Sequence, residues 1–165
     1  MRSITRIGLV VPILLPLAAL QANRASAEGV VESSPPYCAT LAQIADLAAS
    51  IEKFASITGR ERQGDFSDTT LALPGWTDCS IYGPRTYTCD SPAFATSEET
   101  EKAIEAAALE IAVCPGKHWV HSAQQSSSSY VVLVNPAKRV SMTLSAAQND
   151  SNQFVMRLIL FARRE

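Results

Sequence analysis

Residues 77–90 read Thr77-Asp78-Cys79-Ser80-Ile81-Tyr82, then Gly83-Pro84-Arg85, then Thr86-Tyr87-Thr88-Cys89-Asp90. Two β-prone runs flank a Gly-Pro turn, which predicts a β-hairpin. A three-residue loop would place Tyr82 opposite Thr86. Counting back along both strands then places Cys79 opposite Cys89. Because side chains alternate between the faces of a strand, we expect both cysteines on one buried face, together with Ile81 and Tyr87.

The cysteines of the chain are Cys38, Cys79, Cys89 and Cys114. An even number of cysteines in an exported protein is typical of a disulfide framework, and four cysteines allow three connectivities. Directly opposed residues of an antiparallel pair lie within the Cα separation that a disulfide tolerates, so the hairpin favours Cys79 with Cys89. That pairing leaves Cys38 with Cys114, although the sequence alone keeps the other connectivities open.

Two segments have the apolar spacing of amphipathic helices. The first covers about residues 38–57, with apolar positions at Leu41, Ile44, Leu47 or Ala48, Ile51, Phe54 and Ala55. The second begins with a capping box, in which the Thr96 hydroxyl can bind the backbone of Glu99 and the Glu99 side chain can reach back. It continues to about Val113, and Pro115-Gly116 ends it.

The last third of the chain is predicted to form strands, at residues 117–122, 130–134, 139–146 and 153–162. In the third of them, apolar and polar residues alternate, which is typical of a strand with one face in water. The last is apolar on both faces for part of its length and is expected to be central. Residues 58–70 are polar, contain two glycines and are expected to form a surface loop.

The expected element order is therefore α-β-β-α-β-β-β-β, without the βαβ alternation of a parallel sheet. An α+β domain accommodates this pattern, with two helices packed on one face of an antiparallel sheet. We expect a single domain with two disulfides over residues 37–165, preceded by a flexible leader at 28–36.

The first 27 residues have the features of a cleavable secretory signal peptide. Arg2 and Arg6 form a basic start, an apolar run follows at 7–20, and residues 25–27 are small. Cleavage is predicted between Ala27 and Glu28. The apolar run contains two prolines and is shorter than the roughly 20 residues of a membrane-spanning helix. We therefore expect a periplasmic or secreted protein with no membrane span in its mature chain.

Cleavage would also change the charge of the protein. Removing Arg2, Arg6 and Arg24 leaves 11 basic against 16 acidic residues, a formal charge of −5. Phosphate binding needs a basic surface, so we expect no nucleic-acid partner. Part of the negative charge lies on the second helix, where a solvated face accounts for Glu98, Glu99, Glu101, Glu105 and Glu110.

Two groups of residues invite a metal or redox interpretation. Cys114, His118 and His121 have a spacing that could suit zinc or copper. A disulfide at Cys114 would remove one ligand, however, and strand positions three residues apart point to opposite faces. A redox pair needs a close, exposed dithiol, whereas Cys79 and Cys89 are expected to face the core.

A small hydrolase is a further hypothesis. Its nucleophile would be Ser80 or a serine of residues 126–129, its base a histidine, and its orienting group Asp78 or Asp90. The sequence has no Gly-x-Ser-x-Gly motif, and the serine run is expected to be a hairpin loop. Such a site would require the three side chains to meet in one cleft.

The remaining candidates are aromatic residues and one short motif. Core packing is the simpler interpretation of the aromatic residues, although any of them could contact a partner or a sugar: Trp76, Trp119, Tyr82 and Tyr130. Residues 149–151 have the form of a glycosylation acceptor.

No catalytic, metal or cofactor pattern stands out in the sequence. It therefore favours a non-catalytic binding or inhibitor-like module with a protein or small-molecule partner. A small exported hydrolase is one alternative, and a metal or small-ligand carrier that uses His118 and His121 is the other.

Overall fold

The computed structural model describes residues 34–115, 118–127 and 129–162. The predicted signal peptide, its cleavage site at Ala27 and Glu28, and most of the predicted leader lie outside these residues. In chain order the described elements are α1 (Tyr37–Ala49), the 3-10 turn η1 (Ala55–Ile57), β1 (Thr58–Glu61), β2 (Phe66–Thr69), β3 (Thr77–Tyr82), β4 (Thr86–Asp90), α2 (Ser97–Ala112), β5 (Val120–His121), the 3-10 turn η2 (Ala123–Gln125), β6 (Tyr130–Asn135), β7 (Val140–Gln148) and β8 (Phe154–Ala162).

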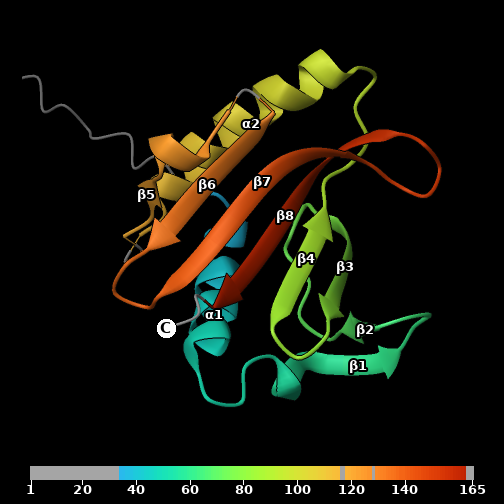
Figure 1. The fold of residues 1–165 in the computed structure, drawn as a ribbon, viewed down its shortest axis with the longest axis vertical. Coiled ribbons are helices and arrows are strands. Elements are labelled where there is room, and N and C mark those ends of the chain that lie inside the picture. The colour runs from blue at the N-terminus through green and yellow to red at the C-terminus, as the bar shows by residue number, and fades with distance from the viewer. Residues whose placement is uncertain (1–33, 116–117, 128, 163–165) are drawn as a thin grey trace, which may run out of the picture. The chain divides into compact units, whose positions relative to one another are not determined.

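Both helices lie on one face of a single antiparallel sheet, whose strand order is β1-β2-β3-β4-β8-β7-β6-β5 (Figure 1). The helices and the sheet bury apolar side chains against each other, among them Leu41, Ile44, Ile104, Ile111, Ile81, Tyr87, Leu133, Met142, Leu144 and Leu158. The structure thus confirms the predicted α+β class with two helices on one sheet face and two disulfides.

The last strand of the chain is central, as its apolar sequence predicted. β8 pairs with β4 on one side and with β7 on the other. Leu158 of β8 lies opposite Cys89 of β4 and Leu144 of β7, and all three are at most 1% exposed. β8 therefore joins the N-terminal hairpin and the C-terminal strands into one sheet.

The first helix is shorter than predicted. It ends at Ala49, because Ser50 has an extended backbone (ψ 166°) and its hydroxyl donates to the carbonyl of Leu47 at 2.7 Å. Phe54 still reaches the core through the turn that follows, whereas Ile51 is 99% exposed. Because Phe54 is buried, its position in the sequence fits the apolar spacing of a further helical turn, although the helix ends before it.

Residues 58–70 form two strands, so the prediction of a surface loop was wrong. β1 pairs with β2 and β2 pairs with β3, which extends the sheet beyond the hairpin. Every residue of β1 is exposed, and β2 is at most partly buried. Backbone hydrogen bonds can hold such strands without burying a face, so no apolar alternation marked them in the sequence.

The strand predicted at 117–122 was also wrong in extent. Residue 117 lies outside the described residues, and of 118–122 only Val120 and His121 form a strand, β5. The chain then leaves the strand path at η2, and the Ser122 amide still donates to the Val132 carbonyl of β6 at 2.8 Å.

The predicted cap of α2 is present. The Thr96 hydroxyl accepts from the Glu99 amide at 3.1 Å, while the Glu99 carboxylate accepts from the Ala95 amide at 3.0 Å.

Both predicted disulfides are present. Cys38–Cys114 ties the start of α1 to the end of α2, where the Tyr37 hydroxyl also donates to Glu110 Oε2 at 2.6 Å. Cys79–Cys89 bridges β3 and β4 with a Cα separation of 4.0 Å.

A β-bulge lies next to the second bridge. Ser80 still pairs with Thr88, but Thr77 pairs with Asp90, so Asp78 and Cys79 together oppose one residue of β4. Asp78 has a left-handed backbone (φ 42°), which aspartate tolerates better than most residues. The predicted register therefore holds as far as the cysteines and shifts beyond them.

Loss of the Cys38–Cys114 bridge should destabilise the protein more than loss of the Cys79–Cys89 bridge. The two bridges have sequence separations of 76 and 10 residues. In the chain-entropy model such loops correspond to about 4 and about 2–3 kcal/mol. Urea unfolding of C38S/C114S and C79S/C89S against the oxidised wild type measures the difference, and equal losses would contradict it.

Alkaline pH should destabilise the fold through two tyrosines. Burial raises the pKa of Tyr87, whose hydroxyl donates to the Leu71 carbonyl at 2.8 Å, and burial together with Glu110 raises the pKa of Tyr37. An unfolded tyrosine ionises near pH 10, so this stabilisation is complete below about pH 10 and falls as the pH rises further. Urea unfolding at about pH 8 to 11 tests this, and Y87F should reduce the slope above pH 10. A slope that Y87F leaves unchanged would rule out the Tyr87 contribution.

Candidate binding groove on the helix-free sheet face

The residues considered for a metal site are not brought together. Cys114 is bonded to Cys38 and so is not a ligand. His118 and His121 are both exposed. Across the described part of the chain, no group of three or more histidine, cysteine or carboxylate side chains could hold a metal ion.

The residues considered for a hydrolase fall into two separate hollows. Asp78, Asp90 and Ser80 line one of them, whereas His121 lines the other together with Ser126 and Ser127. Because the two hollows share no lining residue, the aspartates do not meet a histidine and a serine in one cleft.

The hydroxyl of Ser126 is also occupied by the backbone around it. It donates to the Ser122 carbonyl at 2.8 Å and accepts from the Val132 amide at 3.1 Å. These bonds hold the 122–127 segment against the edge of β6, and they give this serine a structural role.

The cysteine and aromatic candidates divide between core and surface. Cys79 and Cys89 are 8% and 0% exposed and belong to the core. Trp119 is buried, and Trp76 is half-buried against the same core. Tyr82 and Tyr130 are exposed, and the strand registers place both on the sheet face opposite the helices.

The predicted glycosylation acceptor lies in the turn between β7 and β8. The side-chain oxygen of Asn149 accepts from the amides of Ser151 and Gln153, both at 3.0 Å. This bonding explains why an asparagine stands in the turn.

A groove of about 230 Å³ lies on the face of the sheet opposite the two described helices. Strands β2, β3, β4 and β8 contribute its lining, which consists of Phe66, Asp78, Ser80, Tyr82, Thr86, Thr88, Asp90, Arg157 and Ile159. On β4 these residues alternate with the buried Tyr87 and Cys89. Because the two faces of a strand alternate, the groove is separated from the hydrophobic core by the thickness of the sheet.

One end of the groove is aromatic. Phe66 lies opposite Tyr82 in the β2–β3 pair, and their ring centroids are 4.9 Å apart at a 46° tilt. The two residues remain 40% and 47% exposed. Phe161 of β8 pairs with Thr86 and is 36% exposed on the same face, so the aromatic surface continues beyond the groove.

The floor of the groove consists of shorter side chains. Ser80, Thr88 and Ile159 lie side by side across β3, β4 and β8. They stand between the aromatic end and the charged residues of the next row. This difference in side-chain length makes the surface concave.

The other end of the groove is charged. Asp90 of β4 lies opposite Arg157 of β8, and the guanidinium binds the carboxylate through two hydrogen bonds, Nε to Oδ1 at 2.7 Å and Nη2 to Oδ2 at 2.8 Å. Asp90 is 5% exposed. The bond to Asp90, with smaller contributions from the charges of Asp78 and Asp150, raises the pKa of Arg157.

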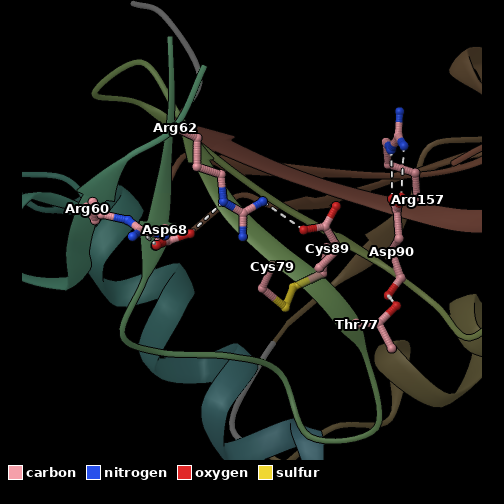
Figure 2. A network of polar contacts seen from close by, with 9 residues as sticks. Arg60, Arg62, Asp68, Thr77, Cys79, Cys89, Asp90 and Arg157 are labelled. Atoms are coloured by element: carbon pink, nitrogen blue, oxygen red, sulfur yellow. Dashed lines mark hydrogen bonds and ion pairs between the residues drawn. A yellow bond between two sulfur atoms is a disulfide. The ribbon is translucent and has the colours of Figure 1, made fainter. Parts of the chain in front are cut away.

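The bulge residue Asp78 completes this charged end. Its Oδ1 accepts from Nη1 of Arg62 at 2.7 Å, while Nε of Arg62 donates to Asp68 at 2.5 Å. The same bond to Arg62 lowers the pKa of Asp68. Figure 2 shows Arg62 beside Asp68, with the Cys79–Cys89 bridge nearby. The disulfide and the bulge together fix where Asp78 presents its carboxylate.

The sequence identified only part of this site. Ser80, Tyr82, Asp78 and Asp90 were candidates, but for separate roles in a hydrolase or a contact surface. Arg157 gave no local signal, because its partner lies 67 residues away. Residues 66–68 lie in the segment that was predicted to be a surface loop, so Phe66 was not considered as a binding residue. The run of hydroxyl-bearing residues on the outer face of the hairpin, Ser80, Tyr82, Thr86 and Thr88, was the one local signal of the groove.

No family model, curated protein or solved structure matches this chain. Among the residues that the structure describes, no helix is long and apolar enough to cross a membrane. The function must therefore be inferred from the chemistry of the groove itself.

Asp90→Ala should lower the free energy of unfolding by about 2 kcal/mol, because hydrogen bonds to charged groups contribute about 1.5–3 kcal/mol. Arg157→Lys should also have a lower free energy of unfolding than the wild type, since an ammonium cannot form the two-bond contact with Asp90. As a control, Lys102→Ala breaks the exposed Glu98–Lys102 pair and should change stability by at most about 0.5 kcal/mol. Urea unfolding of the three variants tests this, and equal effects of D90A and K102A would contradict it.

Proposed function

We propose that the protein is an exported, non-catalytic binding module, periplasmic or secreted, whose binding site is the groove on the helix-free face. The observation that carries this proposal is the exposed Phe66–Tyr82 pair at one end of a hollow with fixed polar groups at the other. Ligand sites combine apolar and aromatic surface with a few well-positioned polar groups in this way.

The environment of the aromatic pair supports a binding role. Aromatic residues are enriched at the centres of interfaces, because they bury a large area with little loss of side-chain freedom. Phe66 and Tyr82 stand on paired strands, so their backbones are held by the sheet. A partner would therefore meet a preorganised surface.

The charged groups of the groove favour ligand binding over catalysis. A general acid or base must exchange a proton with its substrate. Asp78 and Asp90 are each ion-paired with an arginine, and neither histidine lines the groove. The module would act by binding, as an inhibitor does.

Export is supported by the two disulfides and by the sequence of the N-terminus. Disulfides persist in oxidising compartments such as the periplasm and the extracellular space. Residues 1–27 have the basic, apolar and small-residue regions of a signal peptide in the required order.

A matched pair of variants tests the binding role of the groove. Phe66→Ala/Tyr82→Ala removes the aromatic pair, and Leu109→Ala/Val113→Ala removes two exposed apolar residues from the end of α2, 72% and 74% exposed in the wild type. The oxidised wild-type chain, immobilised as bait in an extract of its source organism, should retain a ligand or partner that is identified by mass spectrometry. The groove variant should lose at least about 90% of that material, as expected when the residues at the centre of an interface are truncated.

The α2 variant should retain the same material as the wild type. Retention by both variants, or no retention by the wild type, would contradict the proposal. Conversion of the retained ligand into a product by the wild type would favour the hydrolase alternative.

A further inference from the structure

The groove combines charged side chains with almost complete charge compensation. Arg157 is paired with Asp90, and Arg62 is paired with both Asp78 and Asp68. An anionic or cationic ligand would have to compete with these ion pairs for its counter-charge. The arrangement therefore favours a ligand without a net charge.

Hydrogen-bonding capacity nevertheless remains at the charged end. The two bonds to Asp90 use Nε and Nη2 of Arg157, which leaves its Nη1 without a hydrogen-bond partner among the described residues. Within the same residues, Oδ1 of Asp78 is bonded to Arg62 and Oδ2 is not bonded. The lining of the groove thus offers both a donor and an acceptor, which suits a ligand whose groups both accept and donate, such as hydroxyls.

The two ends of the groove are separated along the strands. Thr86 at the aromatic end and Asp90 at the charged end are four residues apart on β4, a distance of about 13 Å. The groove volume of about 230 Å³ is below the range of about 300–1,000 Å³ that is usual for drug-sized ligands. A chain-like ligand that lies along the strands can reach both ends and continue past the groove.

The position of the groove within the sheet argues against an extended peptide. Peptides that join a sheet do so at an edge, where backbone groups are unpaired. Strands β3, β4 and β8 are each paired on both sides, so the groove presents side chains and no free strand edge. A ligand must therefore be recognised through its own polar groups and apolar faces.

The geometry points to a neutral carbohydrate chain as the ligand, with the apolar face of one sugar ring on Phe66 and Tyr82 and the hydroxyls of a neighbouring ring on Arg157 Nη1 and the Asp78 carboxylate. The hydroxyls of Ser80 and Thr88 add donors and acceptors along the floor. This assignment rests on the proposed binding role of the groove and names the ligand class for it.

Titration of the oxidised chain with neutral trisaccharides tests the assignment. The probes are cellotriose, xylotriose, mannotriose, maltotriose and N,N′,N″-triacetylchitotriose, with trigalacturonic acid as the charged comparison and a Ser-Gly repeat peptide as the extended-chain comparison. At least one neutral trisaccharide should bind saturably and shift backbone amide resonances in β2–β4 and in β8 around Arg157. The acidic sugar and the peptide should bind at least about tenfold more weakly, a difference of about 1.4 kcal/mol.

Two single variants probe the two ends of the groove. Tyr82→Ala and Asp78→Asn should each weaken binding of the neutral sugar by about tenfold or more, and asparagine also tolerates the left-handed backbone at position 78. Leu109→Ala on α2 should leave the affinity unchanged. The amide shifts of the wild type locate the site even where a variant folds poorly.

The outcomes separate this inference from the proposed function. Binding of none of the neutral sugars, or equal or tighter binding of the acidic sugar or the peptide, would overturn the carbohydrate assignment. If material from the extract still depended on Phe66 and Tyr82, the binding role of the groove would stand. Saturable sugar binding with amide shifts confined to α2 or β5 would also overturn the assignment, because the sugar would then bind outside the groove.

Discussion

Strand β4 of the hairpin and strand β8 at the end of the chain pair along five residues, from Thr86 opposite Phe161 to Asp90 opposite Arg157. The remainder of the architecture depends on this contact, because it joins the strands before α2 to those after it. A shift by one residue would turn the core side chains of β8 to the other face. The apolar face of β8 and the Asp90–Arg157 bond both disfavour such a shift.

The same pairing produces two different surfaces. On the helical side it brings Cys89 against Leu158 and Tyr87 against Leu160, and these residues complete the core. On the opposite side it brings Thr88 against Ile159 and Asp90 against Arg157, and these residues form the floor and the charged end of the groove. The strand pairing that completes the core therefore also forms the candidate site. The alternation of the two strand faces couples them.

The β-bulge and the disulfide give the groove its second polar group. A regular β3 would continue the pairing of Ser80 with Thr88 without interruption, whereas the bulge places two residues opposite one. Asp78 then meets Arg62 from the turn between β1 and β2. The short outer strands and the turn between them thus have a role in the site, since β2 supplies Phe66 and the turn supplies the arginine that compensates Asp78.

Local pattern was sufficient for much of the fold. The alternation around the hairpin predicted its register and its bridge, and the capping box at Thr96 and Glu99 predicted the start of α2. Sequence reasoning misjudged two segments for different physical reasons. Residues 58–70 are held by backbone pairing with little burial, and residues 50–57 place Phe54 in the core without an α-helix. The first has no apolar period that identifies it, and the second has a helical apolar spacing that the backbone does not follow.

The sequence by itself determined the class of the fold and the central place of the last strand, because both depend on periodicity. It favoured the observed disulfide pairing without excluding the other connectivities. Only the tertiary structure decided the groove, because its residues come from strands far apart in the chain. Asp90 and Arg157 are separated by 67 residues, and no local pattern encodes which of several polar strand positions will become neighbours. The aspartates, serine and tyrosine that the sequence marked for separate roles lie together for that reason, while the histidines do not join them.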